Sequence, residues 1–141
     1  LNGAYVTRYA GTQTDGSILD VVGTDGSGVA GVGTNPQLRG NITATWARDN
    51  HSVRATSRYT DGTIQRNPRA NQVLTNQGGF SVNDLLYTYN FATANESSVS
   101  LAVLNIGDKV APFVMGSLTT VNSSLHDPRR RMWRLSYNYS F

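Results

Sequence analysis

The chain has 141 residues, no cysteine, and a net charge of +3 from 12 Lys or Arg and 9 Asp or Glu residues. The absence of cysteine excludes a disulfide framework and a thiolate metal site, and no apolar run is long enough for a transmembrane helix. Fourteen glycines and seven tyrosines favour β-structure with turns. The mean hydropathy of −0.35 is still compatible with a membrane barrel, because half of each strand in such a barrel faces a polar lumen.

The positive charge is concentrated near the end of the chain, at Arg129, Arg130, Arg131 and Arg134. Nucleic-acid binding calls for a broad basic face, so nucleic acid is not an expected partner. A solvated cluster or a contact with anionic lipid fits a local group of this kind. No secretory leader can be read at Leu1, and we therefore expect a processed product or a piece of a longer chain.

The first third of the chain predicts one strand and one long loop. Residues 1–9 alternate as part of a strand, and residues 10–38 are rich in Gly, Thr, Asp and Ser, with a short strand expected at 18–22. Residues 39–47 and 53–59 then alternate around a tight turn and predict a hairpin. Its polar face carries Arg54 and Arg58, which a water-filled interior tolerates and a soluble core does not.

The middle of the chain predicts a second long loop, at residues 61–79, because it contains several turn-forming pairs. Long loops on a rigid scaffold are where binding residues usually lie. This loop offers side chains that could hydrogen-bond a sugar or an anionic chelate. They are Arg66, Asn67, Arg69, Asn71 and Gln72. Ordinary solvated loop polarity is the alternative interpretation of the same residues.

The last part of the chain predicts strands at residues 80–91, 98–103 and 131–141, with a long connection before the final strand. Alternation places the aromatic side chains of this final strand on one face. They are Trp133, Tyr137, Tyr139 and Phe141. The opposite face carries Arg134, a candidate lumen-facing residue together with Arg54 and Arg58. Aromatic side chains gathered in this way are typical of the membrane interface of a barrel.

Short turns near residues 49 and 95 alternate with long connections near residues 23, 68 and 117. Strands of about ten residues with short turns at one end and long loops at the other are typical of outer-membrane barrels. The sequence therefore predicts an all-β fold: an antiparallel transmembrane β-barrel segment of about six strands, spanning residues 1–141 as one domain. Single-chain barrels begin at eight strands, so we expect a larger barrel or an oligomeric one to complete it.

Two stretches resemble the C-terminal end of TonB-dependent outer-membrane transporters. One runs from Leu101 through Asn105-Ile106-Gly107-Asp108-Lys109 to Ala111-Pro112-Phe113, similar to the family's penultimate strand and its Asn-Leu-Phe-Asp-Lys continuation. The other is Asp127-Pro128-Arg129-Arg130-Arg131, similar to the family's approach to a last strand that ends in Phe. Ile106-Gly107 and Arg130 depart from the family pattern. The resemblance covers most of residues 39–141.

The resemblance implies a C-terminal part of a 22-stranded barrel in the bacterial outer membrane, with the C-terminus at the periplasmic side. It also implies a plug domain, absent from these residues, and the TonB complex as partners in the uptake of an oligosaccharide, peptide or metal chelate. The last strand is similar to the signal read by the barrel-assembly machinery, here Arg134, Ser136, Tyr139 and Phe141, with Ser136 in place of the usual Gly.

No constellation of residues predicts catalysis or a cofactor, and we do not expect an enzyme. With only His51 and His126 and no cysteine, a zinc site would need carboxylates from separate loops. Two other functions stay open. One is a structural or adhesive envelope β-barrel assembled from several chains, and the other is a soluble β-sandwich binding module.

Overall fold

A computed structural model of the chain describes residues 1–12, 16–25, 34–67, 72–91, 97–113, 121 and 125–139, and gives no side-chain description for residues 25, 65–67 and 72–75. The described residues contain strands and turns and no helix. The fold is therefore all-β, which confirms the all-β part of the expected fold class, and the described strands do not close into a barrel. None of these residues forms a helix with the length and hydropathy to cross a membrane.

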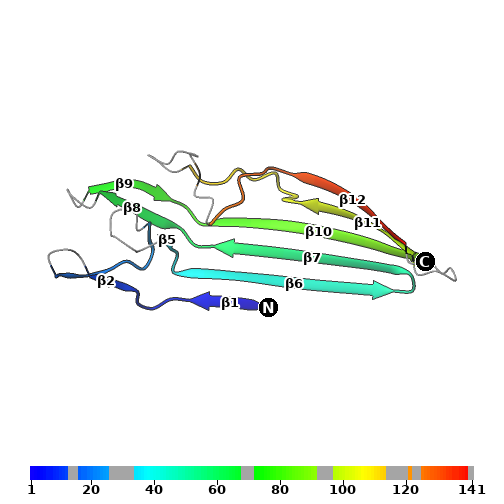
Figure 1. The fold of residues 1–141 in the computed structure, drawn as a ribbon, viewed down its shortest axis with the longest axis horizontal. Coiled ribbons are helices and arrows are strands. Elements are labelled where there is room, and N and C mark those ends of the chain that lie inside the picture. The colour runs from blue at the N-terminus through cyan, green and yellow to red at the C-terminus, as the bar shows by residue number, and fades with distance from the viewer. Residues whose placement is uncertain are drawn as a thin grey trace.

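Six strands form one antiparallel sheet in the order β1-β6-β7-β10-β11-β12 (Figure 1). Their bounds are β1 Asn2–Tyr5, β6 Leu38–Arg48, β7 His51–Thr60, β10 Phe80–Phe91, β11 Ser97–Leu104 and β12 Met132–Tyr139. The six strands of this sheet correspond, in the same order along the chain, to the six main strands that the sequence predicts, and the described residues contain six further strands. The turn between β6 and β7 has two residues, and Asp49 adopts a φ of 50° there, a left-handed conformation that Asp tolerates better than most residues.

The expectation of an irregular loop over residues 61–79 is wrong for much of that stretch. It forms β8 (Thr63–Asn67) and β9 (Gln72–Gln77), an antiparallel pair that continues the β7–β10 hairpin with a register shift at Gln65/Arg66. The turn-forming pairs Asp61-Gly62 and Gly78-Gly79 interrupt the strands without ending the hairpin. The turn-forming pairs predicted this interruption correctly. The sequence pattern did not predict the strands β8 and β9 that lie beyond it.

Shorter strands lie in the first predicted loop. The pair β2 (Ala10–Thr12) and β3 (Ile18–Asp20) is separate, and β3 confirms the short strand expected near residue 18. The strands β4 (Thr24–Asp25) and β5 (Thr34–Asn35) join β8 and β9 in a four-stranded sheet, with β4 parallel to β8. Both small sheets lie at the end of the long sheet that is opposite the β6–β7 turn (Figure 1).

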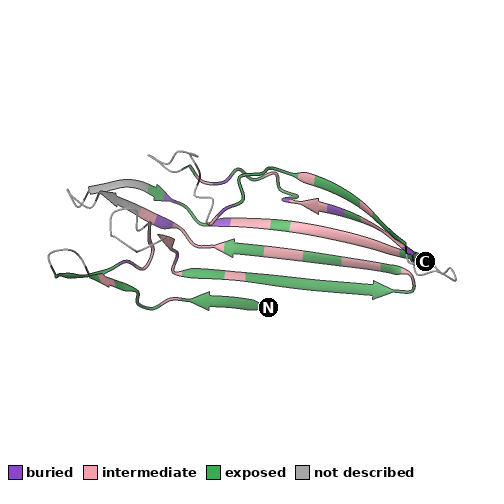
Figure 2. Cartoon of the chain, viewed as in Figure 1, coloured by how far each residue is buried: buried purple, intermediate pink, exposed green. Residues whose placement is uncertain are grey.

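The six-stranded sheet is a single layer in the part of the chain that is described. Extensive contacts between its elements run only between hydrogen-bonded neighbours, and exposed residues follow most of β6 (Figure 2). The accessible surface of the 15.3-kDa chain is 9565 Å², whereas a compact globular protein of this mass has about 7,100 Å². The apolar residues buried among those described are few: Val21, Phe80, Ala102 and Ala111.

Candidate functional site

The pairing register separates the six-stranded sheet into two chemically different faces, because successive residues of a strand point to opposite sides. We call the first the apolar face. It runs continuously from β6 to β12 through directly paired residues, for example Leu85 with Val103 and Leu101 with Leu135. Its apolar and aromatic residues include Ile42, Ala44, Trp46, Val53, Ala55, Leu85, Tyr87, Tyr89, Val99, Leu101, Val103, Trp133, Leu135 and Tyr137, and the polar residues Ser57 and Asn83 lie on the same side.

The apolar face is uncovered on its outer strands. Trp133 is 65% exposed, Leu135 74% and Tyr137 63%. A sheet that buried this face in a soluble core would cover such residues almost completely. The face therefore presents a large apolar surface, and surfaces of this kind mark contacts with protein or membrane.

Aromatic rings gather where the apolar face approaches the β6–β7 turn. The rings of His51 and Tyr89 lie 5.0 Å apart, and those of Tyr89 and Phe91 lie 5.1 Å apart in an edge-to-face arrangement. The Tyr87 hydroxyl and His51 Nδ1 are hydrogen-bonded at 2.7 Å. Amphipathic rings with a polar atom are favoured where an apolar region meets water, so this cluster gives the apolar face a defined border.

We call the opposite side the polar face. Hydroxyl pairs join its strands, Thr43 with Thr56 at 3.2 Å and Thr88 with Ser100 at 3.0 Å. Residues with polar side chains on this face include Arg39, Asn41, Thr43, Thr45, Ser52, Arg54, Thr56, Arg58, Thr60, Asp84, Thr88, Asn90, Ser98, Ser100, Arg134, Ser136 and Asn138. A face with this composition requires water or polar partners.

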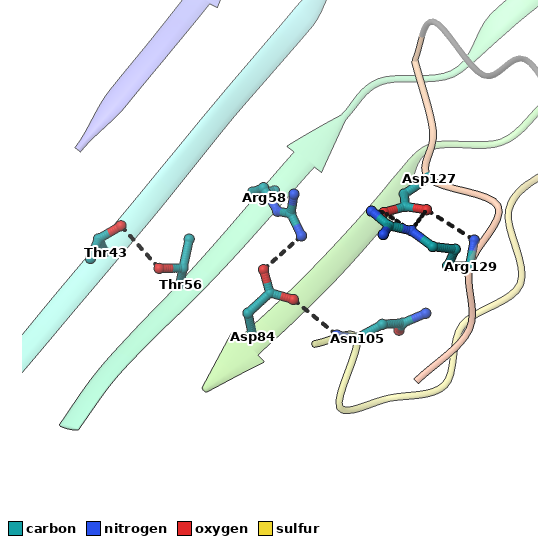
Figure 3. A network of polar contacts seen from close by, with 7 residues as sticks. All are labelled: Thr43, Thr56, Arg58, Asp84, Asn105, Asp127 and Arg129. Carbon is teal, nitrogen blue, oxygen red and sulfur yellow. Dashed lines mark hydrogen bonds and ion pairs between the residues drawn. The ribbon is translucent and has the colours of Figure 1, made fainter. Parts of the chain in front are cut away.

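An ion pair lies at the centre of the polar face. Arg58 Nη2 donates to Asp84 Oδ2 at 2.6 Å, from β7 to β10, and the Asp84 side chain is only 17% exposed. The other carboxylate oxygen, Oδ1, accepts a hydrogen bond from the backbone N–H of Asn105 at 2.9 Å. Figure 3 shows both contacts converging on Asp84. Asp84 thus ties two neighbouring strands to the turn that follows β11.

The turn after β11 is built by Asn105, which is 5% exposed and has a φ of 52°. Its side-chain amide donates to the Lys109 carbonyl at 2.8 Å, and its Oδ1 accepts from the Lys109 N–H at 2.9 Å. Lys109 Nζ in turn donates to the Ser81 hydroxyl on β10 at 2.8 Å. One buried side chain therefore closes this turn and fixes it against the sheet.

The two stretches that carry the family resemblance contact each other. Asp108 Oδ1 accepts a hydrogen bond from the Arg131 backbone N–H at 3.0 Å, and its Oδ2 lies 3.6 Å from Arg130 Nη1. The hydrogen bond from the Arg131 N–H is the largest cause of a lowered pKa at Asp108, and the charges of Arg130 and Arg131 lower it further. Sequence reasoning identified both stretches but not this contact.

Asp127 and Arg129 form a compact pair beside Asp84 (Figure 3). The Arg129 guanidinium donates to both carboxylate oxygens, with 2.7 Å between Nη2 and Oδ2, and the Arg129 backbone N–H donates to Oδ1 at 3.0 Å. The hydrogen bonds from the side chain and backbone of Arg129 lower the pKa of Asp127 to about 2. The carboxylate is therefore ionised at any physiological pH.

The register places the three candidate lumen residues, Arg54, Arg58 and Arg134, on the polar face. Arg54 and Arg134 lie on either side of the paired residues Leu86 and Ala102, around a hollow of about 290 Å³. Arg58 is separate from them and is paired with Asp84. Sequence reasoning missed Asp84, although an acidic residue on the polar parity of the predicted strand 80–91 was a usable signal.

The remaining candidates are placed less completely. Trp133, Tyr137 and Tyr139 lie on the apolar parity of β12 and Ser136 on the polar parity, whereas Phe141 lies outside the described residues. The backbones of three loop candidates belong to β8 or β9, without described side chains: Arg66, Asn67 and Gln72. Arg69 and Asn71 lie outside the described residues. In the described part of the chain no three His, Asp or Glu side chains are grouped for a metal ion.

Comparisons with protein-family models, with curated proteins and with solved structures give no match to this chain.

Proposed function

We propose that this chain is part of the wall of a transmembrane β-barrel in the bacterial outer membrane. The observation that carries the proposal is the division of one sheet into an exposed apolar face and a charged polar face. Lipid would contact the apolar face and water the polar face, which is the alternation that membrane barrels require. The aromatic cluster around His51 and Tyr89 would lie at the membrane interface.

The strand lengths support this proposal. The strand β6 has 11 residues and β7 has 10, and an antiparallel strand rises about 3.4 Å per residue. A strand of about 36 Å tilted by 45° spans roughly 25 Å along the membrane normal, which equals the apolar band of an outer-membrane barrel. The hydrocarbon region can therefore be crossed by these strands without any helix.

The alternative of a soluble β-sandwich has less support. A sandwich would place a second sheet on the apolar face, but the described strands make extensive contacts only with their hydrogen-bonded neighbours. The strands β1 and β12 form the two outer positions of the sheet. Unpaired strand edges are not viable in lipid, so in this proposal further strands of a larger barrel complete both sides.

Within barrel proteins we propose a TonB-dependent transporter. Asp108 contacts the side chain of Arg130 and the backbone of Arg131. These contacts support the assignment, because they join the two stretches that resemble the family. The inferred partners are the rest of the barrel and its plug, the TonB complex, the barrel-assembly machinery and outer-membrane lipid. The inferred cargo is an oligosaccharide, peptide or metal chelate, and Arg54, Arg58 and Arg134 would face its route or the plug.

Uptake by cells tests the transporter assignment. Cells that express the full-length protein should accumulate a labelled oligosaccharide mixture, a labelled peptide mixture or a ferric chelate, and a TonB-deficient strain should not. Replacing Arg54 and Arg134 together with Ala should change this uptake while the amount of protein in the outer membrane stays the same. Accumulation that does not depend on TonB, or no accumulation of any of the three probes, would reject the transporter.

A second candidate is a structural or adhesive envelope barrel that gathers strands from several chains. The two outer strands of the sheet, β1 and β12, favour it as much as they favour a larger single-chain barrel. The molecular mass in detergent separates the two. A small oligomer of identical short chains supports the envelope barrel, whereas one long polypeptide supports the transporter.

A further inference from the structure

The polar face forms one wall of a groove near the start of β6 and the end of β7. The groove has a volume of about 410 Å³, within the range of roughly 300–1,000 Å³ that is usual for small-molecule sites. The strands β1, β6, β7 and β10 supply its floor, and residues 125–127 of the connection before β12 supply the opposite side. The groove lies outside the hollow between Arg54 and Arg134.

The groove carries more positive charge than its own acidic groups neutralise. The Arg39 side chain forms no hydrogen bond or ion pair with the residues that the structure describes. Arg58 donates through Nη2 to Asp84, and a guanidinium has five N–H groups, so donors are left for another acceptor. The acidic residue of the lining, Asp127, is already held by Arg129.

His126 supplies an unpaired polar atom in the same groove. The residue is 4% exposed, and Nδ1 is buried without a hydrogen-bond partner in the described part of the chain. Its ring packs edge-on against Phe80, with 5.0 Å between the ring centroids. Buried polar atoms are nearly always hydrogen-bonded, and Nδ1 has almost no accessible surface although His126 lines the groove. A ligand in the groove therefore pairs with this nitrogen once the His126 ring turns toward it.

The charge state of His126 defines the hydrogen bond that it can make. Burial lowers the pKa of His126, and the nearby charge of Arg39 lowers it further. The ring is therefore neutral at pH 7, and a neutral ring carries one N–H donor and one acceptor nitrogen. With the proton on Nδ1, His126 can donate to an anionic oxygen that also faces Arg39. Phe80 and Leu125 provide apolar contact beside these donors.

We propose that this groove binds a small organic carboxylate. The carboxylate accepts hydrogen bonds from the Arg39 guanidinium and from His126 Nδ1–H, and its apolar body lies against Phe80 and Leu125. Hydrogen bonds between a guanidinium and a carboxylate are charge-assisted and directional, which gives the site its preference for an anion with a planar head group. The proposal concerns the groove alone and does not depend on transport or on the membrane.

Fluorine NMR with the purified full-length protein tests the proposal directly. The probes are 4-fluorobenzoate, the neutral 4-fluorobenzyl alcohol as a matched control, and inorganic phosphate as a competing simple anion. We expect saturable binding of 4-fluorobenzoate with a Kd below about 1 mM, no saturable binding of the alcohol, and little displacement by phosphate. No binding of 4-fluorobenzoate, equal binding of the alcohol, or full displacement by equimolar phosphate overturns the proposal.

Variants assign the binding to the groove. Arg39→Gln should weaken 4-fluorobenzoate binding at least tenfold, because it removes the unpaired charge. His126→Phe keeps a ring against Phe80 and should weaken binding severalfold through the loss of Nδ1. Arg48→Gln removes a charge at the other end of the same strand and should leave the Kd unchanged. Circular dichroism verifies that the strand content is retained, and wild-type affinity in both groove variants overturns the proposal.

Discussion

Arg58 and Asp84 form the one ion pair, among the residues described, that joins two strands of the six-stranded sheet, with 2.6 Å between Nη2 and Oδ2. The pair is asymmetric, because the Arg58 side chain is 53% exposed and the Asp84 side chain 17%. Asp84 also accepts the hydrogen bond from the Asn105 backbone. The Asp84 carboxylate therefore contributes more to the free energy of unfolding than the Arg58 guanidinium does. Substitutions at the two positions can separate these contributions.

Substitutions at this pair should show coupling. Arg58→Ala and Asp84→Asn should each lower the free energy of unfolding by about 1 kcal/mol. The pair is half-exposed, so its contribution to stability falls between those of surface and buried ion pairs. Asp84→Ala should cost more, because the Asn105 N–H then loses its acceptor. Urea unfolding of the single and double variants measures the coupling. Strictly additive effects of Arg58→Ala and Asp84→Asn would contradict the prediction.

Gly62 is predicted to be intolerant of a side chain. A Cβ atom at this position would collide with the backbone carbonyl oxygen of Gln77, whereas a Cβ at Gly78 would meet nothing within 4 Å. Gly62→Ala should therefore destabilise the β8–β9 extension by about 1–3 kcal/mol, while Gly78→Ala should be close to neutral. Hydrogen exchange at the amides of Thr63 and Gln77, which are paired in this hairpin, reports the local opening. Equal exchange rates of these amides in Gly62→Ala and Gly78→Ala would contradict the predicted collision at Gly62.

Asn105 combines a conformational and a hydrogen-bonding role. Asn105→Ala should lose two partly buried hydrogen bonds to Lys109 and force Ala into a left-handed φ, at a total cost of about 2–4 kcal/mol. Asn105→Gly loses the same hydrogen bonds but tolerates the φ of 52°, so it should be milder by about 1 kcal/mol. Hydrogen exchange of the Lys109 amide measures both variants. A glycine variant as unstable as the alanine variant would show that the φ of Asn105 is unimportant.

Asp127 gives a prediction about pH. Because its pKa in the folded protein is about 2 and the ordinary value is 3.8, its ionised form is favoured by folding. The resulting stabilisation is complete above about pH 4 and is lost as the pH falls through about 2. Arg129→Ala should raise the pKa of Asp127 part of the way toward the ordinary value, because the backbone hydrogen bond from residue 129 remains, and carboxyl-carbon NMR measures this change. An unchanged titration in Arg129→Ala would contradict the assigned cause.

Much of the sheet was predictable because alternation is a local property. Trp46, Tyr87 and Leu135 lie on the parity that the sequence assigns to the apolar face, and the six strands follow from the same pattern. The strands β8 and β9 were not predicted, because Arg, Asn and Gln carry little strand propensity and the flanking glycines favour turns. Their pairing comes from the β7–β10 hairpin that they extend.

The polar contacts needed the three-dimensional structure. Asp84 is 21 residues from Asn105, and Asp108 is 23 residues from Arg131, so no spacing in the sequence brings these groups together. His126 falls in the long connection that the sequence predicts before the final strand, and its burial against Phe80 depends on how residues 125–127 lie against the sheet. The charge of each residue and the face of the sheet on which it lies indicated which polar residues could form contacts. The path of the connection between β11 and β12 determines which of these contacts form.

The orientation of the two faces is the central claim, and neighbouring residues of β12 test it most directly. These 141 residues contain no cysteine, so a single cysteine at Leu135 or Ser136 can carry a nitroxide label in the full-length protein, with any cysteine outside them replaced, after reconstitution in lipid vesicles. We predict that the label at 135 is relaxed by oxygen and protected from a water-soluble nickel chelate, and that the label at 136 shows the reverse. Equal access of the nickel chelate to both positions, or protection of position 135 from both reagents, would contradict a lipid-facing apolar surface.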